Sequence, residues 1–152
     1  MQQAKNKSKT FSRKSAFEWS LSYLDRWSIS KKHLLYKLID KGYEKTDIDT
    51  SIAKLEKLKL INDKEYAYQI IKSCLKKYKA KPFIEKKLLA KGISRETIYC
   101  SITKIPTNEY NNLLHKFVQK YINLLSKPAI YHKALLYGWT SEQIIDELNI
   151  FS

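Results

Sequence analysis

The residues of this chain whose types and spacing could do chemistry are lysines of its middle third. Eight of them fall within residues 72–91, where Glu85 is the single acid: Lys72, Lys76, Lys77, Lys79, Lys81, Lys86, Lys87 and Lys91. Helical spacing puts Lys72, Lys76 and Lys79 on one helix face, and Lys87 and Lys91 on another. Such a cluster attracts anions, so it predicts a partner that offers phosphates or an acidic protein groove. The alternative, that each lysine only solvates a helix surface, explains single lysines better than the cluster.

The net charge of +14 is distributed unevenly along the chain. Residues 1–14 carry five bases and no acid, residues 15–62 carry a net +2, residues 63–106 a net +7, and residues 107–152 are neutral. The positive field therefore concentrates on the tail and the middle segment. Residues 1–14 lack the apolar core of a signal peptide, and no apolar run approaches the roughly 20 residues of a membrane span. We therefore expect a cytoplasmic protein without a membrane partner.

The sequence gives little support to other kinds of site. His33, His115 and His132 are scattered, without a carboxylate or cysteine at ligand spacing, so we expect neither a metal nor a catalytic base. A glycine-rich phosphate loop and a nucleophile elbow are both missing from the sequence, and we expect no enzyme and no cofactor. Cys74 and Cys100 fit no ligand pattern and are expected to be buried, reduced thiols.

Three aromatic residues, Trp19, Tyr23 and Trp27, follow one helix face at intervals of four. Such a strip can stack on nucleic-acid bases or dock a protein. More often it packs against a neighbouring element, here the next repeat.

All three glycines of the chain occupy the same position of a repeat. Apolar residues stand eight and four positions before each glycine, a large apolar residue follows it, and isoleucine comes six positions after it. The copies are Leu34, Leu38, Gly42, Tyr43 and Ile48; Ile84, Leu88, Gly92, Ile93 and Ile98; and Ile130, Ala134, Gly138, Trp139 and Ile144. Apolar residues at intervals of four predict an amphipathic helix, and the glycine predicts its left-handed end. A second helix then starts, with Glu44 as a weaker start, Ser94 as a plain cap, and Thr140 with Gln143 as a capping box.

A longer helix precedes each pair. Phe17, Leu21 and Leu24 stripe the first of these helices, and the third is expected to reach Leu125. Ser30 predicts the cap of the following helix, Pro82 and Pro128 open its two counterparts, and Asn62 with Glu65 predicts a capping box. We therefore predict an all-α fold of three tandem three-helix repeats, residues 15–62, 63–106 and 107–152, behind a basic flexible tail, residues 1–14. Repeats this small must stack, so we expect an elongated, curved array and a monomer.

The chain resembles the RecX family, bacterial regulatory proteins that bind the RecA recombinase. The resemblance runs from Leu24-Asp25-Arg26 through Lys41-Gly42-Tyr43 and is strongest at Leu60-Ile61-Asn62-Asp63-Lys64-Glu65-Tyr66-Ala67. It continues through Lys91-Gly92-Ile93 and ends more faintly at Leu135, Gly138 and Ile144.

The resemblance implies a non-enzymatic modulator of recombination and DNA repair that lies along the RecA filament and limits its extension or activity. Its expected partners are the RecA filament and single- or double-stranded DNA. One alternative is a direct DNA-binding repeat protein. The last helices of the first and third repeats argue against it, because residues 44–59 carry both signs and residues 140–149 are mainly acidic. A helical adaptor for an unrelated protein is a further alternative.

Overall fold

A computed structural model describes residues 14–151, and within them every regular element is an α-helix. The predicted all-α fold is confirmed. The helices are α1 (Ala16–Leu24), α2 (Lys31–Asp40), α3 (Lys45–Lys57), α4 (Asp63–Leu75), α5 (Lys81–Ala90), α6 (Arg95–Ile102), α7 (Thr107–Tyr121), α8 (Lys127–Leu136) and α9 (Ser141–Ile150). None of these helices is long and apolar enough to cross a membrane. The predicted tail lies almost wholly outside the described residues.

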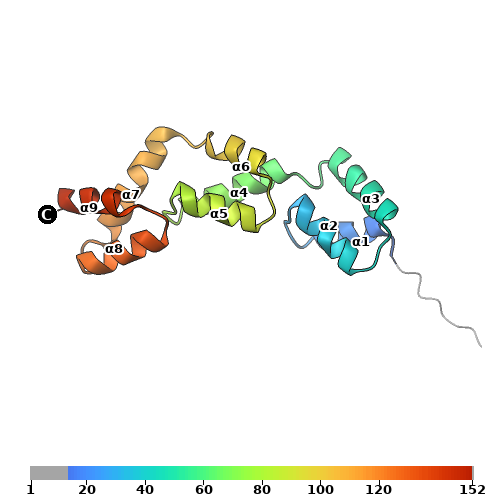
Figure 1. The fold of residues 1–152 in the computed structure, drawn as a ribbon, viewed down its shortest axis with the longest axis horizontal. Helices are drawn as coiled ribbons and strands as arrows, with labels where there is room; N and C mark the ends of the chain where they lie inside the picture. The colour runs from blue at the N-terminus through green and yellow to red at the C-terminus, as the bar shows by residue number, and fades with distance from the viewer. Residues whose placement is uncertain (1–13, 152) are drawn as a thin grey trace, which may run out of the picture.

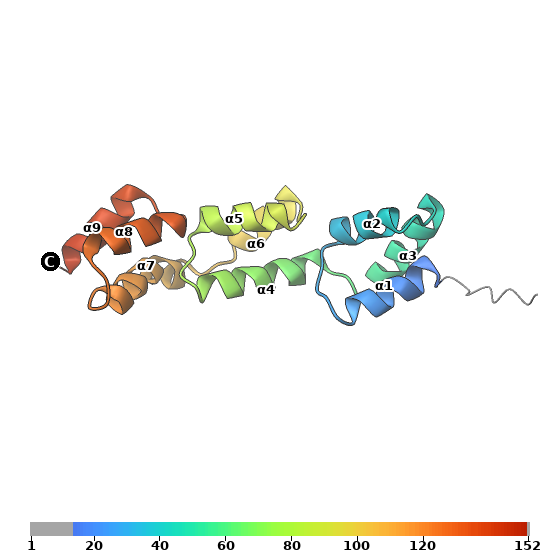
Figure 2. The same cartoon turned by 90° about the horizontal axis from the view of Figure 1, so that it is seen from below.

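The helices pack in three successive groups that follow one another along the length of the molecule (Figure 1). Helices α1–α3 contact one another, as do α4–α6, while α9 packs on both α7 and α8. We call these groups unit 1, unit 2 and unit 3. Turned by 90°, the molecule shows α2, α5 and α8 in one row and α1, α4 and α7 in another (Figure 2). The predicted boundaries at residues 62 and 106 fall in the linkers before α4 and α7, and as a division into domains they stay a prediction.

The buried apolar residues form two separate cores. One core belongs to unit 1 and is built around Leu34, Leu38 and Leu55, none of which is accessible to solvent. The other runs without a break through units 2 and 3, from Ala67 to Leu148. Units 2 and 3 therefore form one apolar body, and unit 1 is attached to it through other contacts.

Each glycine ends a helix as predicted. Gly42, Gly92 and Gly138 have φ angles of 73°, 78° and 90°, which side-chain-bearing residues adopt with strain. The amide after each glycine donates to a carbonyl five residues earlier: from Tyr43 to Leu38 (3.2 Å), from Ile93 to Leu88 (3.1 Å) and from Trp139 to Ala134 (3.2 Å). This is the Schellman arrangement, and it satisfies carbonyls that the helix end leaves free.

Most predicted caps are confirmed. Ser30 and Ser94 accept from the amides of their helices, and Thr140 forms the full capping box with Gln143. Asn62 accepts from the amides of Lys64 and Glu65, so it makes only half of the predicted box. Two further helix ends could not be predicted from a glycine, because the residues in the left-handed position there are Lys59 (φ 56°) and Tyr78 (φ 59°).

The contacts between successive units repeat. At the start of α2, Ser30 Oγ donates to the carbonyl of Lys91, the residue before the glycine of unit 2, at 2.6 Å. At the start of α5, Ala80 N donates to the carbonyl of Tyr137, the residue before the glycine of unit 3, at 2.8 Å. The starts of α2 and α5 therefore contact the glycine turn of the following unit. Because glycine has no side chain, the two backbones can approach closely there.

The two junctions differ in what surrounds this shared contact. Between units 1 and 2 the neighbours are polar, and Lys31 N donates to Asp63 Oδ1 at 2.8 Å. Between units 2 and 3, Trp139 is buried, donates from Nε1 to the carbonyl of Tyr78 at 2.9 Å, and stacks on Tyr110. The apolar junction explains why units 2 and 3 share one core.

Three expectations drawn from the sequence are wrong in part. Of the predicted stripe on α1, Phe17 and Leu24 pack against the core of unit 1, but Leu21 is exposed. The fully buried residues of α1 are the small Ala16 and Ser20, which let α1 lie close to α3. Helix α7 ends at Tyr121, so Leu125 lies beyond it and is exposed. Cys74 is buried as predicted, but Cys100 is exposed on the outer face of α6.

Candidate anion-binding surface

The eight lysines predicted as a site belong to α4, α5 and the turn between them. Lys72 lies on α4 and Lys76 caps its end, but Tyr78 then turns the chain out of the helix. Lys79 therefore does not share a helix face with Lys72 and Lys76, and that prediction is wrong. No salt bridge joins any of the eight to a carboxylate in the described part of the chain, so their charge is not neutralised by ion pairs.

Lys79 is turned inward. Its Nζ lies 3.2 Å from the ring centroid of Tyr137 on the far side of the junction and 4.5 Å from that of Phe83. Burial is the largest cause that lowers the pKa of Lys79, and the charges of Lys87, Lys77 and Lys133 lower it further, against an opposing effect of Cys74. The ammonium is thus held over aromatic faces at the junction of units 2 and 3.

Lys81 has a similar structural role. Its Nζ lies 4.4 Å from the ring centroid of Tyr110, and its amide donates to the Tyr110 hydroxyl at 3.1 Å. Burial raises the pKa of that phenol, although the bond from Lys81 acts in the opposite direction. Lys79 and Lys81 therefore contact unit 3 through aromatic residues. As contacts with a partner, the other six lysines stay a prediction: Lys72, Lys76, Lys77, Lys86, Lys87 and Lys91.

Two lysines of unit 3 extend the surface, and sequence reasoning missed both. Lys133 on α8 contributes to the field at Lys79, and its Nζ lies 4.5 Å from the Tyr121 ring centroid. Lys120 on α7 lies 5.4 Å from the ring centroids of both Tyr121 and Tyr78. No linear spacing relates these residues to α5. They come near Lys79 and Tyr78 only because units 2 and 3 share one core. Residues 107–152 carry no net charge, so counting charges along the sequence does not reveal them.

Together these side chains form a junction cluster, which we define as Lys77, Lys79, Lys87, Lys120 and Lys133. Aromatic rings supply favourable faces to Lys79, Lys120 and Lys133, which offsets part of the repulsion between like charges. A cluster of this kind raises the local concentration of anions and steers acidic or phosphate-bearing partners. It offers electrostatic binding, and the arrangement contains no nucleophile with a base to activate it.

The chain is similar to known proteins in sequence and in fold. No model of a known protein family matches the chain. The chain is 32% identical over 98 residues to a protein of Clostridium perfringens strain 13 named Regulatory protein RecX, and 31% identical over 98 residues to its namesake in strain SM101. Each match covers 64% of this chain and 46% of the relative, so it spans about half the length of the curated relatives.

Two solved structures share the fold. The crystal structure of RecX from Lactobacillus salivarius superposes with a TM-score of 0.71 and 21% identity, covering 88% of this chain and 92% of that one. A crystal structure described as regulatory protein RecX gives a TM-score of 0.65 at 20% identity, covering 84% of this chain and 67% of that one. The resemblance to the RecX family is therefore confirmed, in sequence over 98 residues and in fold over most of the chain.

Proposed function

We propose that this protein is a non-enzymatic regulator that binds the RecA recombinase filament and inhibits its extension, its ATPase and its strand exchange. The observation that carries the proposal is the sequence similarity to proteins named Regulatory protein RecX, supported by the shared fold. In this role the protein modulates recombination and DNA repair in the cytoplasm, acts as a monomer and needs no cofactor.

The shape of the molecule supports this proposal. Three units follow one another in a row, so a single molecule presents a long, narrow surface rather than a compact face (Figure 1). Such a surface suits the groove of a helical filament, where one elongated molecule contacts several subunits. Action at well below one molecule per recombinase follows from this geometry.

Charge supports the proposal as well. Within residues 14–151, the exposed lysines of α4 and α5 and the junction cluster form no ion pair with a carboxylate. Their field is therefore suited to acids or phosphates that line a filament groove. Binding to double-stranded DNA through the last helix of a unit is a weaker alternative. Helix α9 carries Glu142, Asp146 and Glu147, whose charges repel a phosphate backbone.

The experiment is the ATPase rate of the host RecA on single-stranded DNA as this protein is added. The full chain is expected to suppress hydrolysis when present well below one copy per recombinase. Reversing Lys72, Lys76, Lys86 and Lys87 to Glu is expected to weaken inhibition, mainly by slowing association, and to flatten its dependence on salt. Hydrolysis that continues at the normal rate under saturating protein contradicts the proposal.

A matched control separates this surface from total charge. Lys45, Lys57, Lys104 and Lys116 are exposed and lie on α3, after α6 and on α7, away from α4 and α5. Reversing these four to Glu changes the net charge by the same amount and is expected to leave most of the inhibition intact. If both variants lose inhibition equally, the effect comes from net charge, and the assignment to the lysines of α4 and α5 fails.

A further inference from the structure

Unit 1 carries an aromatic hollow that the lysine surface does not include. It has a volume of about 250 Å³ and is lined by Lys14, Trp19, Ser22, Tyr23, Arg26 and Trp27. The three rings of the strip predicted from the sequence all line it. Trp19 and Tyr23 pack partly against the core of unit 1, but Trp27 is 61% exposed, so the expectation that the whole strip packs against the next repeat is wrong.

Two of the three rings are stacked on each other, and all three line the hollow. Trp19 and Tyr23 are stacked, with centroids 5.1 Å apart and planes 19° from parallel. Trp27 follows one turn later, because the chain continues to turn after α1 and Trp27 N donates to the carbonyl of Tyr23 at 3.1 Å. No ring contact engages Trp27 within the described residues. Exposed indoles are enriched at contacts with partners.

Cations surround these rings. Lys37 Nζ, on α2, lies 5.3 Å from the Tyr23 ring centroid, and Lys41 Nζ, at the C-cap of α2, lies 5.8 Å from that of Trp19. Lys14 and Arg26 line the hollow from the two ends of α1. Among the residues that the structure describes, no carboxylate lines it. Glu18, the acid on α1, accepts from the amide and hydroxyl of Ser15 in a capping box, and the bonds from Ser15 are the main cause that lowers its pKa.

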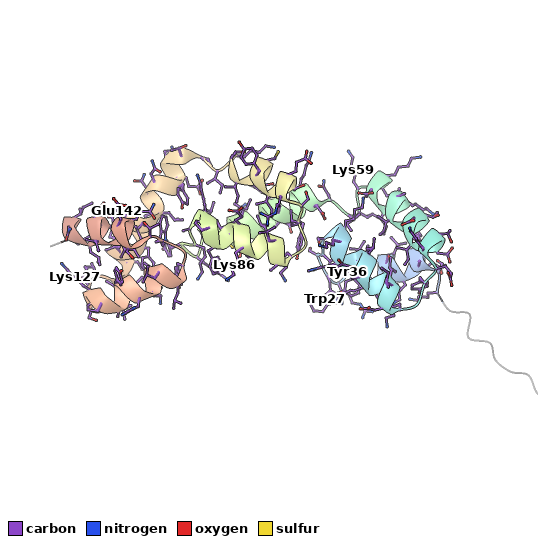
Figure 3. The ribbon with its side chains drawn as sticks, in the orientation of Figure 1. Trp27, Tyr36, Lys59, Lys86, Lys127 and Glu142 are labelled. Carbon is purple, nitrogen blue, oxygen red and sulfur yellow. The ribbon has the colours of Figure 1, made fainter. Side chains whose placement is uncertain are left out.

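This combination selects one kind of ligand. A peptide of acidic residues without aromatic ones satisfies the cations but offers no ring to stack on the aromatic side chains. An apolar peptide satisfies the rings but leaves the four cations unused. Single-stranded nucleic acid offers unstacked bases and phosphates at alternating positions, which is what aromatic faces among cations bind. A duplex does not fit, because its bases are already stacked. Figure 3 shows Trp27 at the lower edge of unit 1 and Lys59 at its upper edge.

We propose that the hollow of unit 1 binds single-stranded nucleic acid by stacking bases on Trp27 and the Trp19–Tyr23 pair, with phosphates held by Lys14, Arg26, Lys37 and Lys41. This inference goes beyond the proposed function, since it assigns a direct contact with a strand that needs no recombinase. Stacking on aromatic side chains tolerates any base, so the site reads no sequence.

The test uses the full chain and a labelled oligothymidine strand, without recombinase, and follows binding by fluorescence anisotropy. Trp27→Ala is expected to weaken binding on the order of tenfold, the loss typical of one stacked base. Trp27→Phe is expected to restore most of it, because the phenyl ring keeps a stacking face. Tyr99→Ala is the matched control: Tyr99 is 72% exposed on α6, outside the hollow, and its removal is expected to leave binding unchanged.

Further arms decide the chemistry of the ligand. Lys37→Glu with Lys41→Glu is expected to reduce the slope of log K against log salt by about 2, one for each lost phosphate contact. An oligouridine strand is expected to bind comparably, and a blunt DNA duplex much more weakly. The proposal is overturned if Trp27→Ala binds the strand as the parent does, or if the duplex binds as tightly and loses as much with that substitution.

Discussion

Replacing Gly138 by alanine tests the role of the glycine turns most sharply. All three glycines are left-handed, so alanine at each position meets strain of about 1 kcal/mol. At Gly138 the added Cβ would also lie 2.9 Å from Phe83 Cβ and 3.1 Å from Phe83 N. Because one of these atoms belongs to the backbone of α5, the clash is relieved only by moving unit 2 away from unit 3.

The contacts predict an order of severity. Forced overpacking costs about 1–3 kcal/mol, so Gly138→Ala is expected to lose roughly 2–4 kcal/mol in total. At Gly92 the Cβ would meet Ser30 Oγ at 3.1 Å and the ring of His33 at 3.2 Å. Those side chains can shift, so we expect about 1–2 kcal/mol there. Gly42 is exposed in unit 1, and only the strain of about 1 kcal/mol is expected.

Urea unfolding followed by far-ultraviolet circular dichroism measures these losses. Tryptophan fluorescence shows which part of the molecule unfolds, because Trp139 is buried at the junction of units 2 and 3 while Trp19 and Trp27 lie in unit 1. Gly138→Ala is expected to shift the transition of units 2 and 3. A loss at Gly138 no greater than that at Gly42 would refute the reasoning, since it would mean that the turn only ends a helix and does not receive α5.

Three further predictions follow from single residues. Lys59→Gly is expected to stabilise the fold by about 0.5–1 kcal/mol, because Lys59 has a φ of 56°, which glycine adopts without strain. Its control, Ala53→Gly at an exposed position within α3, is expected to destabilise the fold by a similar amount, and melting temperatures that shift in the same direction for both variants would contradict this. Ser30→Ala removes both a helix cap and the 2.6 Å hydrogen bond to the Lys91 carbonyl, and it is expected to lower the free energy of unfolding in urea by about 1–3 kcal/mol. A loss below about 0.5 kcal/mol would show that this hydrogen bond does not stabilise the junction of units 1 and 2. Burial raises the pKa of Tyr110 from 10.0, so the contribution of its neutral hydroxyl to stability is complete below about pH 10 and is lost as pH rises through the folded value. The loss of stability at alkaline pH, followed by circular dichroism, is therefore expected to be less steep in Tyr110→Phe, and identical curves for the two proteins would exclude this cause.

The sequence predicted those features that arise from neighbours along the chain. A glycine after apolar residues at intervals of four fixes a helix end through bonds that span five residues, and all three were predicted. The caps at Ser30, Ser94 and Thr140 are equally local. The ends at Lys59 and Tyr78 were missed because neither side chain favours the left-handed region, and tertiary packing imposes it.

The candidate site was predicted only in part, because it depends on contacts between units. Counting charges found the lysines of α4 and α5, but it could not show that Lys79 and Lys81 turn onto the rings of Tyr137 and Tyr110. The same long-range packing adds Lys120 and Lys133, which no spacing rule connects to unit 2. Side-chain direction and partner across a junction are set by the packed structure, so composition alone reports the field and not its shape.

Co-sedimentation with the host RecA tests the central claim most directly. The full chain is incubated with RecA and ATP, with and without single-stranded DNA, and the filaments are pelleted by centrifugation. The protein is expected in the pellet only when filaments have formed, at fewer than one copy per recombinase, and release by salt is expected since charge steers the contact. Filaments that pellet and leave this protein wholly in the supernatant would contradict the account, whatever the strand-binding assay shows.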